Sequence, residues 1–372
     1  MIINDVTKVQ AINTVLHNNS ANVVNINWNS VHWVNNDASR TFADFPNLTT
    51  VSNIGNTVEK LYQTFYNCRQ LVNAPDIPAS VTNMLQTFQN CTSLVVAPNI
   101  ANGPTVLEST FKGCTSLVNV TLPESVTHLT YTFQDCKSLT TPPVIPNSVT
   151  NMQYTFGYCS NLTTAPTLPN NVQSLYATFI EVPITEVPTI PNSVTNMGMT
   201  FRATNIINAP EIHNGVKDMT QTFHYCYDLV NAPTIIPESV NRFEWCFAGS
   251  NKITTAPIIK GKDIESLYGS FDGCTSLTGD LYIYSENISN IQRAFQGTHL
   301  NAIYVPFNNA GINTITYNTF IAAGYTVLDI NQPAEKEVDL TGFTYTIDEN
   351  NVATLTGLDM ADKSSVTLPN VN

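Results

Sequence analysis

Apolar residues in this chain recur mainly at every third or fourth position, inside blocks that are rich in Ser, Thr, Asn and Pro. The spacing does not fit a half-buried strand, and the blocks are too polar and too interrupted for helices of their own. One block, SVTNMQYTFGYCSNLTTAPTLP at 148–169, closely matches SVTNMLQTFQNCTSLVVAP at 80–98. Because nearly the same letters return, the pattern indicates an internal repeat.

The repeat is clearest in its phenylalanines. Thirteen of the 17 Phe residues share one register, and each lies 22 to 25 residues from the next. These residues, called the Phe column below, are Phe42, Phe65, Phe88, Phe111, Phe133, Phe156, Phe179, Phe201, Phe223, Phe247, Phe271, Phe295 and Phe320. One repeat cannot bury its apolar residues alone, whereas stacked repeats bury them against one another. The sequence therefore predicts a repeat solenoid of about 13 turns.

Proline restricts how these turns pair. Written from its Phe, the repeat reads FxxCxxLxxAPxIPxSVTNMxxT, with the Phe, Cys, Leu, Ala, Ile, Val and Met expected to point inward. Proline cannot donate to an interior ladder, so we expect a narrow parallel sheet, two or three residues per turn, beside an extended proline side. The proline column is Pro75, Pro98, Pro143, Pro166, Pro188, Pro210, Pro233 and Pro257.

The segments TFQNCTSLVVAP, TFKGCTSLVNVTLPESVTHL and TFQDCKSLTTPPVIPNSVTNM resemble the BspA-like leucine-rich-repeat family of bacterial surface proteins, over roughly residues 40 to 325. The C-terminal GFTYTIDENNVATLTGLDMADKSSVTLPNVN is similar to a β-hairpin segment that often precedes such arrays. The resemblance implies a right-handed, leucine-rich-repeat-like array and a role in adhesion or protein binding rather than catalysis.

Three regions are expected along the chain. Residues 1–40 are predicted to form an N-terminal helical cap, since Val6, Val9 and Ile12 have helical spacing after an Asn or Asp N-cap. The solenoid is expected over 41–325. Residues 326–372 are predicted to hold a polar linker and a C-terminal β-hairpin, because apolar residues alternate around the turn former DENN at 348–351.

Eight cysteines are the first candidates for chemistry. Seven of them lie three residues after a column Phe: Cys68, Cys91, Cys114, Cys136, Cys159, Cys226 and Cys274. Other turns carry Phe45, Val182, Thr204, Ser250 or Thr298 at this position, which favours a packing position. Disulfides between adjacent turns and a metal or nucleophilic role are the alternatives. The CxxC spacing of a zinc site does not occur.

No other motif indicates catalysis. The six histidines are scattered over different repeats, and the sequence lacks a phosphate-binding glycine loop, a GxSxG elbow and an EF-hand. We therefore expect no enzymatic activity, catalytic residue, cofactor or metal. Only 12% of residues are charged, and the formal charge of −13 disfavours nucleic acid and anionic membranes as partners. No run approaches 18 apolar residues, so membrane insertion is not expected.

The surface is then the expected site of function. Two positions after the Leu of each repeat form rows of uncharged hydroxyls and amides, and a second row just before the Thr-Phe pair is aromatic. These rows are expected either to bind a protein or a glycan, or only to pair with neighbouring turns. The candidate residues are Thr140, Thr141, Thr163, Thr164, Asn208, Asn231, Tyr131, Tyr154, Tyr176 and Trp245.

Two functions from different classes fit these expectations. The family resemblance favours a recognition or adhesion module that meets a protein or glycan on an extracellular surface, as a monomer or an oligomer. The given chain shows no export signal, which favours a structural phage virion component such as a head or tail appendage.

Overall fold

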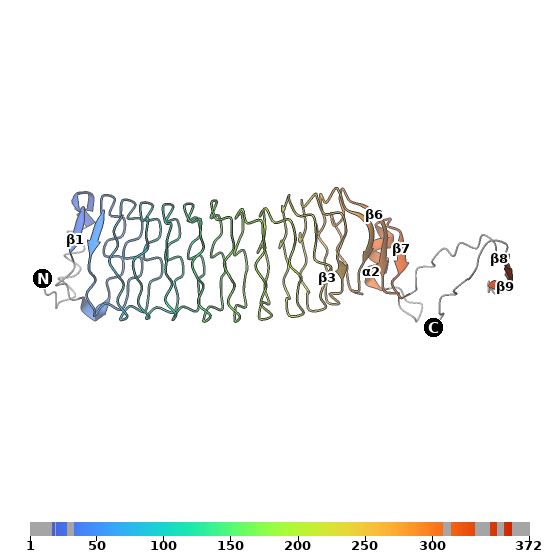
Figure 1. Ribbon diagram of the computed structural model, residues 1–372, viewed down its shortest axis with the longest axis horizontal. Coiled ribbons are helices and arrows are strands. Elements are labelled where there is room, and N and C mark those ends of the chain that lie inside the picture. The colour runs from blue at the N-terminus through green and yellow to red at the C-terminus, as the bar shows by residue number, and fades with distance from the viewer. Residues whose placement is uncertain are drawn as a thin grey trace. The chain divides into compact units, whose positions relative to one another are not determined.

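The computed structural model describes residues 17–18, 20–27, 33–307, 314–331, 343–347 and 353–358. The chain divides into two compact units, Met1–Ile330 and Asn331–Asn372. In the first unit, successive repeats form turns of backbone that stack one on the next, as the sequence predicts (Figure 1). The predicted helix over the first residues and most of the predicted linker lie outside the described residues.

The Phe column is the centre of the stack. From Phe42 to Phe295, each ring lies roughly parallel to the ring of the next turn, at centroid distances of 5.2 to 6.0 Å. Phe320 continues the column at a tilt of 39° to Phe295. All thirteen side chains are buried, so the prediction of a shared Phe core is confirmed.

Backbone hydrogen bonds around each Phe join one turn to the next. In the turn of Phe88, the amides of Gln86, Phe88 and Asn90 donate to carbonyls 22 residues further on, at 2.7 to 3.0 Å. The residues two before and two after the Phe have left-handed backbone, with φ of 57° at Gln86 and 62° at Asn90. This conformation explains why Asn, Asp or Gly so often follows the Phe by two positions, since these residues tolerate positive φ best.

Two columns of buried side chains bond back to the preceding turn. In the turns from Phe65 to Phe223, the Thr before the column Phe donates its hydroxyl to a carbonyl 25 or 26 residues earlier, as Thr110 does to Met84 at 2.9 Å. The Cys three residues after the Phe donates its thiol to the carbonyl of the preceding column Phe, at 2.9 to 3.2 Å. In the turn of Phe247, Ser250 donates a hydroxyl in the same place, at 2.6 Å. The Cys position is therefore a donor position as well as a packing position.

The sheet is narrow and parallel, as predicted, and is mostly reduced to single-residue bridges. One ladder of bridges lies five residues before the column Phe, for example His128 with Asn151, and another lies near the exposed rows, for example Asn208 with Asn231. The short parallel pairs are β1 (Asn25–Asn27) with β2 (Thr50–Ser52) and β3 (Ile235–Ile236) with β4 (Ile258–Ile259). Two 3-10 helices, η1 (Ser20–Asn22) and η2 (Val34–Asn36), flank β1.

The last repeats are more regular than their sequence suggests. β5 (Thr278–Tyr282), β6 (His299–Val305) and β7 (Val327–Asp329) form a three-stranded parallel sheet. Between β6 and β7, helix α2 (Ile315–Ala322) carries Phe320 into the core, and its N-cap Thr314 accepts a hydrogen bond from the Tyr317 amide at 3.1 Å. The sequence did not predict this helix. The sheet also continues to Asp329, four residues beyond the expected end of the repeats.

The second unit contains the predicted hairpin. β8 (Phe343–Ile347) pairs antiparallel with β9 (Ala353–Leu358), with Thr346 opposite Thr354. The DENN turn between the two strands lies outside the described residues.

Candidate binding surfaces

The uncharged rows predicted from the sequence are on the surface. Thr140, Thr141, Thr163, Thr164, Asn208 and Asn231 are all exposed. They lie where the backbone leaves the buried Leu of each repeat and approaches the proline column, so each turn contributes its members at the same place. The structure thus aligns these residues along the stack, which is what a shared binding face requires.

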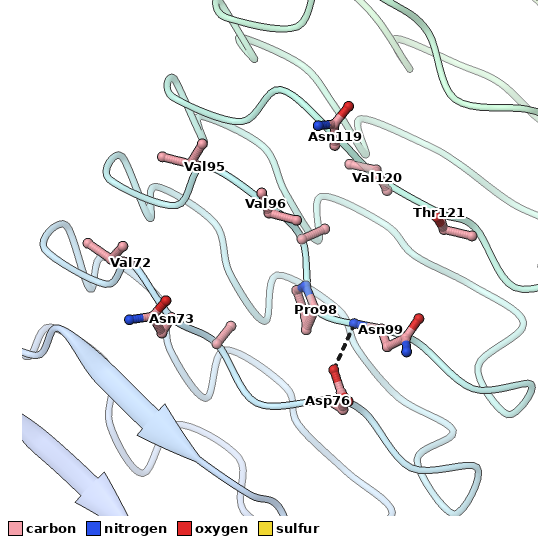
Figure 2. A pocket seen from close by; sticks show the side chains of 12 residues that line it. Val72, Asn73, Asp76, Val95, Val96, Pro98, Asn99, Asn119, Val120 and Thr121 are labelled. Atoms are coloured by element: carbon pink, nitrogen blue, oxygen red, sulfur yellow. Dashed lines mark hydrogen bonds between the residues drawn. The ribbon is translucent and has the colours of Figure 1, made fainter.

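Valines cluster among the polar residues at the N-terminal end of this face, and Ile207 and Val230 are exposed further along the same rows. Val72, Val95 and Val96 are 45%, 42% and 55% exposed, although valine is usually buried. Figure 2 shows the two turns that carry these valines beside the next turn, which carries Asn119, Val120 and Thr121. Residues of the three turns line a hollow of about 510 Å³. Asn73, Asn99 and Asn119 line its polar parts. The backbone N–H of Asn99 donates a hydrogen bond to the Asp76 carboxylate at 3.1 Å. We call this the valine hollow; its residues were not among the candidates predicted from the sequence.

Hydrogen bonds between neighbouring turns involve only some of the side chains in the uncharged rows. The Asn231 carboxamide donates to Asn208 Oδ1 at 2.6 Å, as expected for a ladder of amides. Within the described residues, the hydroxyls of Thr140, Thr141, Thr163 and Thr164 make no hydrogen bond to protein. Their hydrogen-bonding capacity therefore faces solvent and remains available to a partner.

The aromatic row separates into two groups. Tyr131 stacks on Tyr154 at 4.8 Å, and Tyr176 meets Tyr154 edge-on at 5.6 Å. Trp245 lies further along the stack and meets Tyr268 edge-on at 4.9 Å. All four predicted aromatics are half-buried, so packing against neighbouring turns and partial exposure occur together. Burial raises the pKa of Tyr131 and Tyr176, and the neighbouring Tyr154 adds to both shifts.

Trp245 borders a second hollow, of about 390 Å³, which we call the aromatic hollow. Its other named members are His224, Tyr225, Asp272 and Arg293, none of which the sequence analysis selected. The His224 ring stacks on Tyr225 at 3.9 Å and on Trp245 at 5.9 Å, and the Arg293 guanidinium lies 5.3 Å from the Trp245 ring. Burial, with a smaller contribution from Arg202, lowers the pKa of His224 to about 4.

The thiols are not arranged for chemistry. All eight cysteines are buried and free, so the alternative of disulfides between turns does not occur in this structure. Burial raises the pKa of Cys68, Cys159, Cys226 and Cys274 to about 12, which keeps these groups protonated. A reactive cysteine needs the opposite shift. The described part of the chain also holds no cluster of three or more His, Cys, Asp or Glu residues able to bind a metal.

None of the described helices is long and apolar enough for a bilayer crossing.

Stacked turns, a narrow parallel sheet and a buried column of repeat residues define a leucine-rich-repeat solenoid, a class of fold that is typically non-catalytic. The model of the BspA type leucine-rich-repeat region matches residues 3–95, 86–207 and 199–323. The chain belongs to this family, and the resemblance noted from the repeat motifs is confirmed.

One solved structure with a TM-score above 0.5 shows the same fold, and two others match with lower TM-scores. A leucine-rich repeat protein from Bacteroides ovatus ATCC 8483 is 20% identical, with 77% of this chain and 76% of that chain covered and a TM-score of 0.53. A leucine rich cell surface protein from Faecalibacterium prausnitzii A2-165 is 21% identical over 83% of this chain and 84% of its own, with a TM-score of 0.42. The leucine-rich repeat protein of T. pallidum is 26% identical over 40% of this chain and 64% of its own, with a TM-score of 0.31. A search of curated proteins finds no match.

Proposed function

We propose that this protein is a non-catalytic recognition module that binds a protein partner on an external surface through the exposed rows and the valine hollow. The observation that carries this proposal is the clustered exposure of Val72, Val95 and Val96 around one hollow, on a face whose other members are mostly Thr and Asn. Grouped exposed apolar residues within a polar surround are typical of a protein interaction site.

The composition of the face favours a protein over a small ligand. The valine hollow is open and spans three turns, and a further hollow lies along the same rows, lined among others by Thr163, Thr164 and Thr185. An extended surface of this kind offers many weak contacts, which is how solenoids use their repeated faces. The polar residues beside the valines, such as Asn73 and Asn99, supply hydrogen bonds at the rim of the contact.

The proposed external location rests on family membership. Leucine-rich-repeat proteins generally mediate protein contacts. The role as a virion component has no comparable support, since the matching family model describes a BspA type leucine-rich-repeat region.

The test uses the full chain against a panel of purified extracellular proteins, with affinity measured by biolayer interferometry. Val96→Asp places a charge in the valine hollow and should weaken binding to the true partner at least tenfold. Val144→Asp is the matched control, because Val144 is 88% exposed and lies outside the hollow. Binding that persists after enzymatic removal of the partner's glycans supports a protein epitope.

Two results would contradict the proposal. One is the absence of binding to every protein of the panel. The other is an equal effect of Val96→Asp and Val144→Asp, which would place the contact elsewhere.

A further inference from the structure

The aromatic hollow lies where consecutive turns lack a side chain. Two residues after the column Phe, most turns carry Asn, Asp, Glu or Tyr, but the three consecutive turns of Phe247, Phe271 and Phe295 carry Gly249, Gly273 and Gly297. The two glycines that line the hollow, Gly249 and Gly273, have left-handed backbone, with φ of 75° and 73°. A Cβ at Gly249 would lie 2.5 Å from the Tyr225 ring, whereas a Cβ at Gly273 would meet only the Gly249 backbone, at 3.7 Å. The backbone at Gly273 therefore lines the hollow without a side chain to cover it, and the Tyr225 ring lines the same hollow.

The walls of the hollow combine aromatic surface with polar groups. Tyr225 is 40% exposed and is held in place by its stacking on His224. On the other side, the Arg293 guanidinium pairs with the Asp272 carboxylate at 2.5 Å, and Gln221 adds a carboxamide. The Asp272 side chain is only 13% exposed, so the pair is partly shielded from solvent.

The charges of the residues that line the hollow balance, and one further cation, Arg202, lies 5.9 Å from the Tyr225 ring. Asp272 and Arg293 compensate each other, and the imidazole of His224 is neutral near pH 7 because its pKa is lowered to about 4. A neutral ligand is therefore favoured over an ion. A carboxylate only accepts hydrogen bonds and a guanidinium only donates them, so the pair suits a ligand whose groups do both, such as a polyol.

We propose that the aromatic hollow binds a neutral pyranose unit of a glycan, with the C–H face of the sugar on Tyr225 and its hydroxyls on Asp272, Arg293 and Gln221. Aromatic faces carry partial negative charge and attract the polarised C–H bonds of a sugar ring. The volume of about 390 Å³ lies in the lower part of the range for small-ligand sites. This activity goes beyond the protein-binding role proposed above and does not depend on it.

The test probes the full chain on an array of defined oligosaccharides that end in hexoses or N-acetylhexosamines. Gly273→Asn fills the floor of the hollow and should weaken binding at least tenfold. The substitution is compatible with the backbone, because Asn67 and Asn90 occupy the same position of other turns with positive φ. Gly113→Asn is the matched control, since Gly113 has the same φ of 73° in a distant turn and faces the flexible Asn90 side chain. It should leave binding unchanged.

Asp272→Asn keeps the shape of the wall and removes the acceptor charge, and we expect it to weaken binding as well. Val96→Asp should retain glycan binding, which separates this site from the proposed protein-binding face. The proposal is overturned if no glycan of the array binds, or if Gly273→Asn and Gly113→Asn bind equally well. It is also overturned if blocked tripeptides bind the chain and Gly273→Asn abolishes that binding while no glycan binds, because the occupant would then be a peptide.

Discussion

The Cys114 thiol donates a hydrogen bond to the Phe88 carbonyl oxygen of the preceding turn, at a distance of 3.0 Å. Cys114→Ala removes this donor and leaves a buried carbonyl without it, so we expect a loss of about 1 to 3 kcal/mol in the free energy of unfolding. Cys114→Ser should cost less, since Ser250 already serves the same position with its hydroxyl. Urea unfolding of both variants measures the difference. Equal losses would mean that the sulfur contributes by packing alone.

Phe156 lies in the middle of the Phe column, 5.7 Å from the ring of Phe133 and 6.0 Å from that of Phe179. Phe156→Ala opens a cavity between two turns and should destabilise the protein by about 3 to 5 kcal/mol. Phe156→Leu fills more of the space and should cost clearly less. Thermal and urea unfolding provide the measurement. An unchanged unfolding midpoint for Phe156→Ala would contradict the role of the column as the core.

The buried thiols make stability sensitive to alkaline pH. The pKa of Cys68, Cys159, Cys226 and Cys274 is about 12 in the folded protein against 9.0 for a free thiol, so the unfolded chain releases these protons first. Their contribution to stability is complete below pH 9 and is lost as the pH rises from 9 towards 12. Unfolding midpoints measured over this range test the slope. In a Cys68→Ser, Cys159→Ser double variant, the unfolding midpoint should fall less steeply with pH than in the wild type. Half-buried tyrosines, whose pKa values are also raised, are unchanged in this variant, so the difference reports the thiols alone.

Native thiols should also be unreactive. All eight cysteines are buried and protonated, so a thiol reagent at pH 8 should find none in the native protein and eight after denaturation. A single fast-reacting native thiol would indicate an accessible, activated cysteine and would contradict this structure.

Gly269 allows the Trp245 ring to lie against the backbone. A Cβ at residue 269 would come within 2.3 Å of that ring, and the backbone there has a φ of 64°. Gly269→Ala should therefore destabilise the protein more than Gly273→Ala, which has a similar φ of 73° but open space around its Cβ. Unfolding midpoints and tryptophan fluorescence compare the two variants. Similar losses would show that backbone conformation alone sets the cost.

The period of the Phe residues was sufficient to predict the stack, because each turn has an apolar Phe ring that only a neighbouring turn can bury. The acceptor of each thiol was not predictable from the period alone. It depends on where the Phe carbonyl of the preceding turn points, which follows from left-handed residues such as Gln86 and Asn90. Helix α2 was missed because TYNTFIAAG departs from the repeat and its apolar residues were assigned to another turn.

The candidate surfaces were predicted in part for a related reason. Thr163 and Asn208 could be placed on the surface because their rows recur. The aromatic hollow, in contrast, arises where turns differ from one another, and no single repeat contains it. A usable signal was present in the sequence: three successive turns carry a glycine two residues after the column Phe, namely Gly249, Gly273 and Gly297. Interruptions of a repeat can therefore be as informative as the repeat itself.

Hydrogen bonds between neighbouring turns run along the direction of stacking, as from the Phe88 amide to the Thr110 carbonyl. A tensile force along that direction acts equally on each set of hydrogen bonds between neighbouring turns. The weakest set therefore breaks first, while the other sets remain intact. Each opening releases only one turn of chain. Under traction the array would thus lengthen in small steps and dissipate work gradually, as an extensible tether does, instead of failing at once.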